Sequence, residues 1–335
     1  MIRSAILGAS GYVGGELLRL IAAHPQLAPA KLFGESRAGQ PLGAVHPHLG
    51  AWCANADIER FDEEALDGID LVFAALPHGQ SQKIAPAILG KGVPFVDLGA
   101  DFRLEGASTY EHWYGHPHEA PELLPSFVYG IPELNRHAIR NAKAIAAAGC
   151  YATAAILAMK PLVDAGLVER DSLIVDAASG VSGAGRELKE MASFCAVSES
   201  FSAYGLLNHR HTAEMEMALG GTVLFTPHLA PMSRGILATC YASAIDSGDP
   251  LEVLREAYTD EPFVHVIPNP PATKWVVGSN AAQLTARYDE RTGRVLTICA
   301  IDNLGKGAAG QMTQCANLML GLDETAGLTS IGVYP

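Results

Sequence analysis

Three glycines near the start of the chain, Gly8, Gly11 and Gly14, are spaced as GxxGxxG and constrain the fold more than any other feature. The apolar residues 4–7 before them read as a strand, and residues 16–21 after them have the spacing of a helix. In such a unit the first glycine permits a tight turn, the second lets a pyrophosphate approach, and the third lets the helix pack on the strand. The pattern predicts a dinucleotide-binding loop with contacts from Gly8, Ser10, Gly11, Tyr12 and Val13.

Short apolar strands alternate with helical segments in the first part of the chain. Strands are expected over residues 30–33, 69–75, 94–98 and 142–147, with a helix over 81–89. Strands that alternate with helices form a parallel, doubly wound sheet. From Leu173 onward the expected strands are longer, at 222–225, 235–245, 283–289 and 295–301. We therefore expect an α/β fold: a Rossmann-type doubly wound parallel sheet plus an α+β catalytic domain with a mainly antiparallel sheet. Residues 103–136 have few periodic runs, and we interpret them as a functional insertion between sheet strands and not as a linker.

Length, charge and cysteine content narrow the class of protein. A chain of 335 residues favours two domains, since single cores rarely grow beyond roughly 250–300 residues. A formal charge of −13 argues against a nucleic-acid or anionic-membrane partner, because both need clustered Lys and Arg. Six cysteines without CxxC spacing argue against disulfides and structural zinc. With no signal peptide and no apolar run of about 18 residues, we expect a cytoplasmic protein.

The residues that follow the second strand, Glu35, Ser36 and Arg37, bear on the choice of dinucleotide. An acidic residue there can hold the ribose hydroxyls of NAD, whereas an arginine accommodates the additional phosphate of NADP. Both residue types are present, so the choice stays open on physical grounds alone. Ser36 and Arg37 together suit a phosphate and favour NADP(H), although Arg37 also fits a solvated loop cation.

Cys150 lies where a strand that ends near Gly149 gives way to a helix expected over 151–165. A cysteine at a helix N-terminus is favoured as the thiolate, which is the nucleophilic form. The other cysteines are interpreted as small buried residues: Cys53, Cys195, Cys240, Cys299 and Cys315. The sequence predicts a nucleophile at Cys150.

A base for this thiol is offered by His209 and His211, whose imidazoles point to one side if the stretch is extended. An HxH pair also suggests a metal ion, but no third ligand follows at a suitable spacing. Acid–base chemistry is therefore preferred, and no metal is expected.

The chain resembles the N-acetyl-gamma-glutamyl-phosphate reductase family, which acts in arginine biosynthesis. The resemblance is carried in order by GASGYVGGEL (8–17 with its preceding strand), ALPHG (75–79), DLGADFR (97–103), YGIPELNR (129–136), AGCYATA (148–154), SGVSGAGR (179–186), HRH (209–211), FTPHLAPMSRGILATCYA (225–242), GSN (278–280) and IDNLGKGAAGQ (301–311).

This resemblance implies an NADP-dependent oxidoreductase that reduces an acyl phosphate to a semialdehyde through a thioester on Cys150. It implies His211 as the acid–base, with His209 nearby, and a homodimer or homotetramer. It also implies that the Rossmann domain is completed by the C-terminal helix, so that residues 1–149 and 307–335 enclose a catalytic domain over 150–306. The other implied contacts are Arg103, Arg234 and Tyr151 for substrate and Pro77, Ser182, Gly183 and Lys306 for cofactor.

Two related activities remain as alternatives. Many family members have Pro-Gly-Cys where this chain has Ala148-Gly149-Cys150, and this departure also resembles the aminoadipyl-phosphate reductase of lysine biosynthesis. The carrier protein of that pathway is acidic, so the net charge of −13 counts against it. Aspartate-semialdehyde dehydrogenase uses the same cysteine chemistry, but the HRH and IDNLGKGAAGQ stretches favour the glutamyl family. Which arginine holds which anion stays open.

Overall fold

The computed structural model, which describes residues 1–50, 52–53 and 55–335, groups the chain into two units. The first unit is Met1–Ala148 with Ala308–Leu328, and the second is Gly149–Gly307 with Thr329–Pro335. The sequence placed residues 307–335 together in the Rossmann domain. The last segment instead bonds to the second unit, where Val333 N donates to Val277 O at 2.8 Å and Asn280 N donates to Thr329 O at 2.8 Å.

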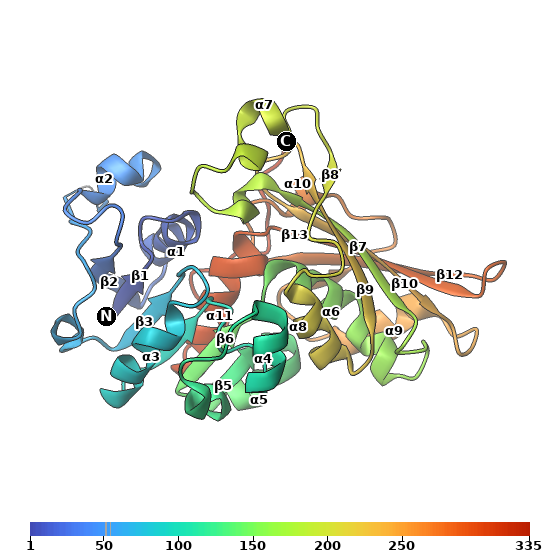
Figure 1. Cartoon of the computed structure of the whole chain (residues 1–335). Helices are drawn as coiled ribbons and strands as arrows, with labels where there is room; N and C mark the ends of the chain where they lie inside the picture. The colour runs from blue at the N-terminus through green and yellow to red at the C-terminus, as the bar shows by residue number, and fades with distance from the viewer. Residues whose placement is uncertain (51, 54) are drawn as a thin grey trace. The chain divides into compact units, whose positions relative to one another are not determined.

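The first unit is built on a six-stranded, wholly parallel sheet in the order β2-β1-β3-β4-β6-β5 (Figure 1). Its strands are β1 (Ile2–Leu7), β2 (Leu27–Phe33), β3 (Leu71–Ala74), β4 (Phe95–Asp97), β5 (Phe127–Gly130) and β6 (Ala144–Ala147). Its helices are α1 (Tyr12–Ala22), α2 (Leu42–Val45), α3 (Ser81–Gly90), α4 (Ala107–Tyr114), α5 (Pro132–Arg140) and α11 (Gly310–Met319). This confirms the predicted doubly wound sheet.

The core of the first unit explains why its strands are apolar throughout. All four residues of β3 are completely buried, as expected of a strand covered by helices on both faces. Helix α11 comes from the far end of the chain and contacts α1, α5 and the strands β4 and β6. Met312, Cys315 and Ala316 of this helix lie in the same apolar cluster as Leu17 and Leu18.

The structure of the first unit differs in places from what local sequence showed. Residues 103–136, which have few periodic runs, contain α4, β5 and the start of α5. His46 and His118 are buried, and a ring nitrogen of each bonds a backbone carbonyl oxygen, that of Ala9 and that of Asp101 respectively. Cys53 is only partly buried, and Cys195 of the second unit is exposed on the short helix α7 (Phe194–Val197).

The second unit contains a seven-stranded sheet in the order β11-β12-β13-β10-β7-β9-β8, in which most neighbours are antiparallel. Its strands are β7 (Leu173–Gly180), β8 (Ser202–Ala203), β9 (Val223–Ala230), β10 (Ile236–Ser243), β11 (Val264–Val266), β12 (Ala282–Asp289) and β13 (Arg294–Ile301). Its remaining helices are α6 (Cys150–Asp164), α8 (His211–Leu219), α9 (Pro250–Ala257) and α10 (Thr273–Val276). The predicted mainly antiparallel sheet is confirmed.

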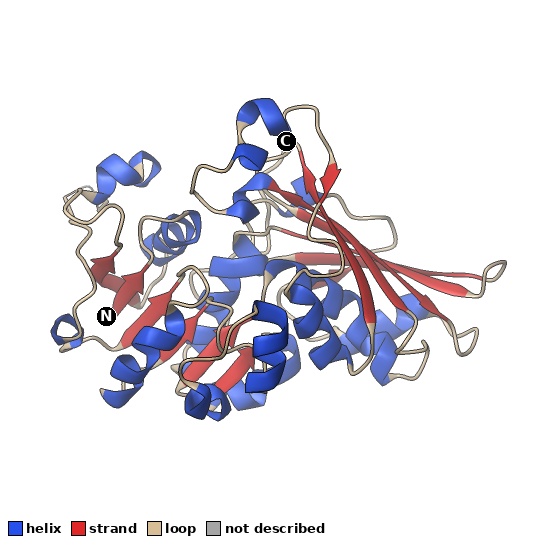
Figure 2. Cartoon of the chain, in the orientation of Figure 1, coloured by secondary structure: helices blue, strands red, loops and turns tan. Residues whose placement is uncertain are grey.

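Helices cover one face of this second sheet. Helix α6 contacts β7, β10 and β13, while α8 contacts β9 and α9 contacts β12 (Figure 2). Side chains alternate along each strand, so Val175, Phe225 and Cys240 are buried toward the helices. Leu224 and Tyr241 point to the other face and are 50% and 38% exposed.

Candidate active site

The candidate nucleophile Cys150 is the first residue of α6, and Gly149 is the N-cap of that helix. This confirms the helix start that the sequence predicted. Cys150 is partly buried. The amides of a first helical turn point toward the helix start, so α6 directs its positive end at this position. Such an environment stabilises a thiolate, and it also stabilises an oxyanion that forms on a group bound to the sulfur.

Glu214 links the start of α6 to the histidine pair, and the sequence did not single it out. Its carboxylate is fully buried, and Oε2 accepts a hydrogen bond from Gly149 N at 2.9 Å. Its Oε1 lies 3.8 Å from Nε2 of His211, one helical turn earlier on α8. One carboxylate therefore bonds the residue before Cys150 and lies beside an imidazole. The His-x-x-Glu spacing at a helix start was the available signal.

The rings of His209 and His211 lie 4.7 Å apart and nearly perpendicular. The reason given for this pairing was wrong, because the stretch is not extended. His209 precedes α8 in irregular backbone, and His211 is the first residue of that helix. The backbone N–H of His211 donates to Nδ1 of His209 at 3.2 Å, so the change of direction at the helix start brings the two rings together.

The two histidines differ in their capacity to carry a proton. Burial, with help from the nearby His211 and Arg210, lowers the pKa of His209 to about 3. His209 is therefore neutral near pH 7, with its proton on Nε2, because Nδ1 accepts the bond from His211 N. A neutral imidazole with such a low pKa is poorly suited to proton transfer at neutral pH. His211 is left as the acid–base candidate of the pair.

Tyr151, predicted to bind substrate, packs beneath the histidines. Its ring centroid is 5.6 Å from that of His209 and 5.9 Å from that of His211. Its hydroxyl donates to His228 O at 2.9 Å and accepts from the Tyr204 hydroxyl at 3.2 Å. Burial raises the pKa of Tyr151 and raises that of Tyr204 to about 12, so both stay neutral phenols. The Tyr151 ring therefore packs against both imidazoles, and its contact with substrate stays a prediction.

A π-helical turn at Gly305–Ala309 lies against the nucleophile. A Cβ on Gly307 would stand 2.8 Å from Cβ of Cys150, and a Cβ on Gly305 would stand 2.2 Å from Ser279 O. Only glycine permits this approach, and single π turns often mark functional sites. Lys306, expected to contact the cofactor, is instead fully buried with Nζ 5.9 Å from the centre of the Phe263 ring. The contact of Lys306 with the cofactor stays a prediction.

Arg234 forms a bidentate ion pair with the fully buried Asp302, with Nε–Oδ1 and Nη2–Oδ2 distances of 3.1 and 2.8 Å. Asp302 also accepts from the amides of Gly278 and Leu304, at 2.5 and 2.9 Å. The neighbouring Asn303 holds Ser182 Oγ at 2.9 Å. Arg234 keeps its place as a predicted substrate residue, but its orientation is set by Asp302, which the sequence did not identify.

The glycine loop of the first unit has the geometry that a dinucleotide requires. Gly8 has φ of +82°, and a Cβ on Gly14 would stand 2.3 Å from Gly8 O, so both positions need glycine. Gly11 is the N-cap of α1, whose first turn holds no acidic residue. Exposed amides in such a place attract phosphate.

The other predicted cofactor residues of the first unit follow the ends of neighbouring strands. Ser36 and Arg37 are exposed in the turn after β2, and Pro77 is exposed after β3. In doubly wound sheets, ligands bind at the carboxyl ends of the strands. The residues therefore meet at one edge of the sheet, which fits the dinucleotide prediction.

Arg103 and its motif play a structural part in the first unit. Its Nη2 donates to Leu98 O at 2.6 Å, and the guanidinium is buried. Asp101 accepts from the amides of Gly79 and Gln82, at 2.6 and 3.1 Å, and so supports the start of α3. The contribution of Arg103 to substrate binding stays a prediction.

Asp97 is the first residue of the DLGADFR stretch that also contains Arg103, and it leads to a prediction about stability. Its carboxylate is fully buried and accepts from Ser81 Oγ at 2.7 Å and from Gly99 N at 2.8 Å. Burial raises its pKa from 3.8 to about 7. Between about pH 4 and pH 7, Asp97 keeps its proton in the folded chain and loses it in the unfolded chain. The free energy of unfolding therefore falls by ~4 kcal/mol as pH rises through this range. Asp97→Asn, which cannot titrate, should lose this slope.

The measurement is urea unfolding of both proteins between pH 4 and pH 8.5. The difference in unfolding free energy, wild type minus variant, is expected to fall with pH and to level off above about pH 7. A constant difference would show that Asp97 is ionised throughout.

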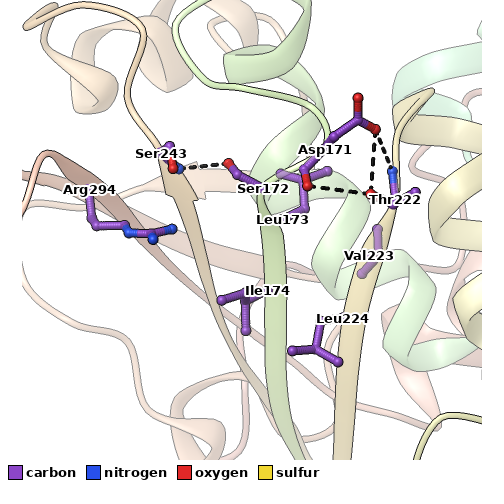
Figure 3. Close-up of a pocket in the computed structure, with 9 residues that line it drawn as sticks. All are labelled: Asp171, Ser172, Leu173, Ile174, Thr222, Val223, Leu224, Ser243 and Arg294. Atoms are coloured by element: carbon purple, nitrogen blue, oxygen red, sulfur yellow. Dashed lines mark hydrogen bonds between the residues drawn. The ribbon is translucent and has the colours of Figure 1, made fainter.

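A surface pocket of about 460 Å³ lies on the second unit (Figure 3). It is lined by Asp171, Ser172, Leu173, Ile174, Thr222, Val223, Leu224, Ser243 and Arg294, and none of these is a predicted site residue. Ile174 and Leu224 face one another on adjacent strands, as the β7–β9 register requires. The pocket is thus a hollow on the open sheet face and does not contain the cysteine or the histidines.

Across residues 1–50, 52–53 and 55–335, no three His, Cys, Asp or Glu side chains are grouped to hold a metal ion. Within the same ranges, none of the helices combines the length and apolar character needed to cross a membrane.

Comparison with known proteins gives a consistent result over the whole chain. Residues 3–142 match the family model for the NAD binding domain of semialdehyde dehydrogenase, and residues 150–303 match its dimerisation domain. An N-acetyl-gamma-glutamyl-phosphate reductase of Streptomyces coelicolor is 50% identical over 349 residues, covering 100% of this chain and 99% of the relative. The protein of the same name from Desulforudis audaxviator is 46% identical over 350 residues, with 100% of both chains covered.

Solved structures agree on the fold. Aspartate semialdehyde dehydrogenase II of Vibrio cholerae, in complex with ASA, has a TM-score of 0.72 at 18% identity, over 96% of this chain and 98% of that one. The Candida albicans aspartate semialdehyde dehydrogenase with NADP has a TM-score of 0.71 at 16% identity, over 96% and 98%. At these identities the likeness establishes the architecture alone.

Proposed function

We propose that this chain, which belongs to the N-acetyl-gamma-glutamyl-phosphate reductase family, reduces N-acetyl-gamma-glutamyl phosphate to the 5-semialdehyde with NADPH. The observation that carries the proposal is the arrangement around Cys150: a helix start, a buried carboxylate on Gly149, and two imidazoles packed on Tyr151. The full-length relatives at 44–50% identity bear this name, which favours the glutamyl substrate over the aminoadipyl and aspartyl alternatives.

The chemistry follows from these groups. His211 accepts the Cys150 thiol proton, and the thiolate attacks the acyl carbon. The bond from that carbon to the phosphate oxygen breaks, inorganic phosphate leaves with the proton from His211, and a thioester forms. When bound, NADPH supplies the hydride that reduces the thioester. The amides at the start of α6 stabilise the resulting oxyanion; its C=O bond then re-forms as the C–S bond breaks, releasing the aldehyde and the Cys150 thiolate. The thiolate released at the end of the cycle takes its proton back from solvent.

The remaining residues bind and orient. Glu214 positions Gly149 through a hydrogen bond and lies beside the His211 ring. His209 orients His211 by accepting the bond from its backbone N–H. Arg234, steered by Asp302, is proposed for an anionic group of the substrate, and Arg103 remains a second candidate. Ser182 and Gly183 are proposed for the nicotinamide side of the cofactor, since Asn303 fixes Ser182.

NADP is preferred over NAD because of Arg37. The arginine is exposed at the edge where the adenosine ribose of a bound dinucleotide lies, and Ser36 adds a hydroxyl donor beside it. Glu35, also exposed there, is the group that would favour NAD instead.

The reverse reaction tests the proposed function. Purified protein is mixed with N-acetylglutamate 5-semialdehyde, inorganic phosphate and NADP, and absorbance of the reduced cofactor is followed. Turnover that requires phosphate is the expected result, and aspartate semialdehyde should give a rate at least about 100-fold lower, because the site must accommodate an N-acetyl group and a longer chain. Faster turnover of aspartate semialdehyde would overturn the substrate assignment, and no turnover of either would overturn the activity.

We further propose a homodimer, or a tetramer built from such dimers, that pairs through the open sheet face of the second unit. Leu224, Ile174, Tyr241 and Leu296 form one cross-strand row over β9, β7, β10 and β13. Leu224 and Tyr241 are substantially exposed despite being large and apolar. Exposed apolar rows of this kind mark protein–protein contacts, and residues 150–303 match a domain described as a dimerisation domain.

Substitution in the middle of this row is expected to break the dimer. Ile174→Glu places a charge between two apolar neighbours that a partner would cover, so light scattering after gel filtration should show a monomer mass. The matched control is Leu188→Glu, at a fully exposed leucine outside the sheet, which should leave the mass unchanged. An Ile174→Glu protein with the mass of the wild type would place the interface elsewhere.

A further inference from the structure

His46 is held against the glycine loop of the first unit. It lies between α2 and the 3-10 turn Pro47–Leu49, and its side chain is buried. Its own backbone is anchored, since His46 N donates to Leu42 O at 2.7 Å and Leu49 N donates to His46 O at 3.0 Å. The ring nitrogen Nε2 lies 2.9 Å from the carbonyl oxygen of Ala9. The imidazole thus connects a segment 37 residues later in the chain to the loop.

The identity of the two atoms decides the direction of this hydrogen bond. A carbonyl oxygen only accepts, so Nε2 of His46 carries the proton and donates. The peptide group between Ala9 and Ser10 is planar and trans, with its C=O and N–H on opposite sides. Holding the Ala9 oxygen therefore also fixes the direction of the Ser10 N–H. The bond to His46 sets the orientation of an amide in the predicted phosphate-binding loop.

Gly15 provides an independent sign that the ring position matters. A Cβ at Gly15 would stand 2.5 Å from Cε1 and 2.7 Å from Nδ1 of the His46 ring, closer than real Cβ contacts. Gly15 lies inside α1, where glycine is the least favourable residue after proline, and its φ is not positive. No backbone strain explains the glycine, whereas the imidazole does.

We propose that His46 is a positioning residue for the dinucleotide, which orients the phosphate-binding loop through the Ala9 carbonyl and for which Gly15 leaves room. The inference rests on the proposed function, because it assumes that the loop binds a dinucleotide. The rest of the loop is held by its own backbone, with Gly8 N and Ala9 N both donating to Phe33 O at 2.9 Å. Loss of the imidazole should therefore disturb the Ala9–Ser10 peptide while leaving the strand and helix intact.

Direct NADPH binding, measured by fluorescence titration, tests the proposal with four variants. His46→Leu removes the donor, His46→Gln restores an Nε2–H donor at similar reach, and Gly15→Ala displaces the ring with His46 still present. The control is His48→Leu, at the exposed neighbour whose ring lies 5.5 Å from that of His46. We expect the Kd for NADPH to rise about tenfold in His46→Leu and Gly15→Ala, as for one lost hydrogen bond.

The pattern across variants separates positioning from general damage. His46→Gln should return the Kd to within about threefold of the wild type, and kcat at saturating NADPH should be unchanged in every variant, because the lost contact acts on cofactor binding alone. A His46→Leu protein that binds NADPH as tightly as the wild type, or a fall in kcat without a change in Kd, would overturn the inference.

The wild-type titration distinguishes this outcome from failure of the proposed function. A wild type that binds no NADPH and no NADH removes the dinucleotide function and this inference together. A wild type that binds NADPH, with Kd values for His46→Leu and Gly15→Ala unchanged, removes only the role of His46.

Discussion

Cys150→Ser is expected to lower phosphate-dependent turnover of the semialdehyde by about four orders of magnitude or more, with NADP binding retained. The serine hydroxyl is about the same size but is not ionised near pH 7, so the positive end of α6 has no thiolate to stabilise. The loop proposed to bind the cofactor belongs to the first unit, and α6 starts in the second, so the Kd for NADP should stay within about twofold.

The matched control for this variant is Cys195→Ser. Cys195 is exposed on the four-residue helix α7 (Phe194–Val197). Its replacement should leave kcat unchanged. Turnover by Cys150→Ser within tenfold of the wild type would rule out the thioester route, since no covalent intermediate would then be needed.

His211→Asn is expected to lower kcat by about 10²–10⁴-fold, which is the usual contribution of a positioned acid–base group. His209→Asn should have a smaller effect, because asparagine retains an acceptor for the backbone N–H of His211. His209→Leu removes that acceptor, so its loss of kcat should lie between the losses of His209→Asn and His211→Asn. The NADPH Kd should be unchanged in all three.

The pH dependence of kcat separates the two histidines further. Burial lowers the pKa of His209 to about 3, so it stays neutral from pH 5 to pH 9 and contributes no step there. The profile of His209→Asn should therefore keep the shape of the wild-type profile, whereas His211→Asn should lose its acidic limb. An acidic limb that disappears in His209→Asn and persists in His211→Asn would exchange the two assignments.

Much of the fold was accessible from local pattern. Apolar runs such as Leu71–Ala74, alternating with helical segments, indicated a parallel sheet, and the longer strands expected after Leu173, which include parts of β9 and β10, indicated a mainly antiparallel one. The strands that the pattern missed include β5, because Phe127–Gly130 is only four residues long and follows a proline-rich 3-10 turn over Pro121–Ser126. A short edge strand carries too few residues to show a period.

The candidate site divides in the same way. Gly8, Gly14 and Cys150 could be identified because each works through its own strand-to-helix turn, which local sequence specifies. Glu214 and Asp302 were missed because their partners, Gly149 and Arg234, lie 65 and 68 residues away. Buried carboxylates of this kind are recognised by their long-range partners, and the His-x-x-Glu spacing of Glu214 shows only its local contact with His211.

The sequence by itself determined the element types, the glycine loop and the cysteine at the head of a helix, because these depend on contacts within a few residues. Only the tertiary structure decided that His209 is neutral, that Lys306 is buried and that His46 braces the loop. Burial and long-range hydrogen bonds set those properties, and both arise when segments that are distant in the chain pack together.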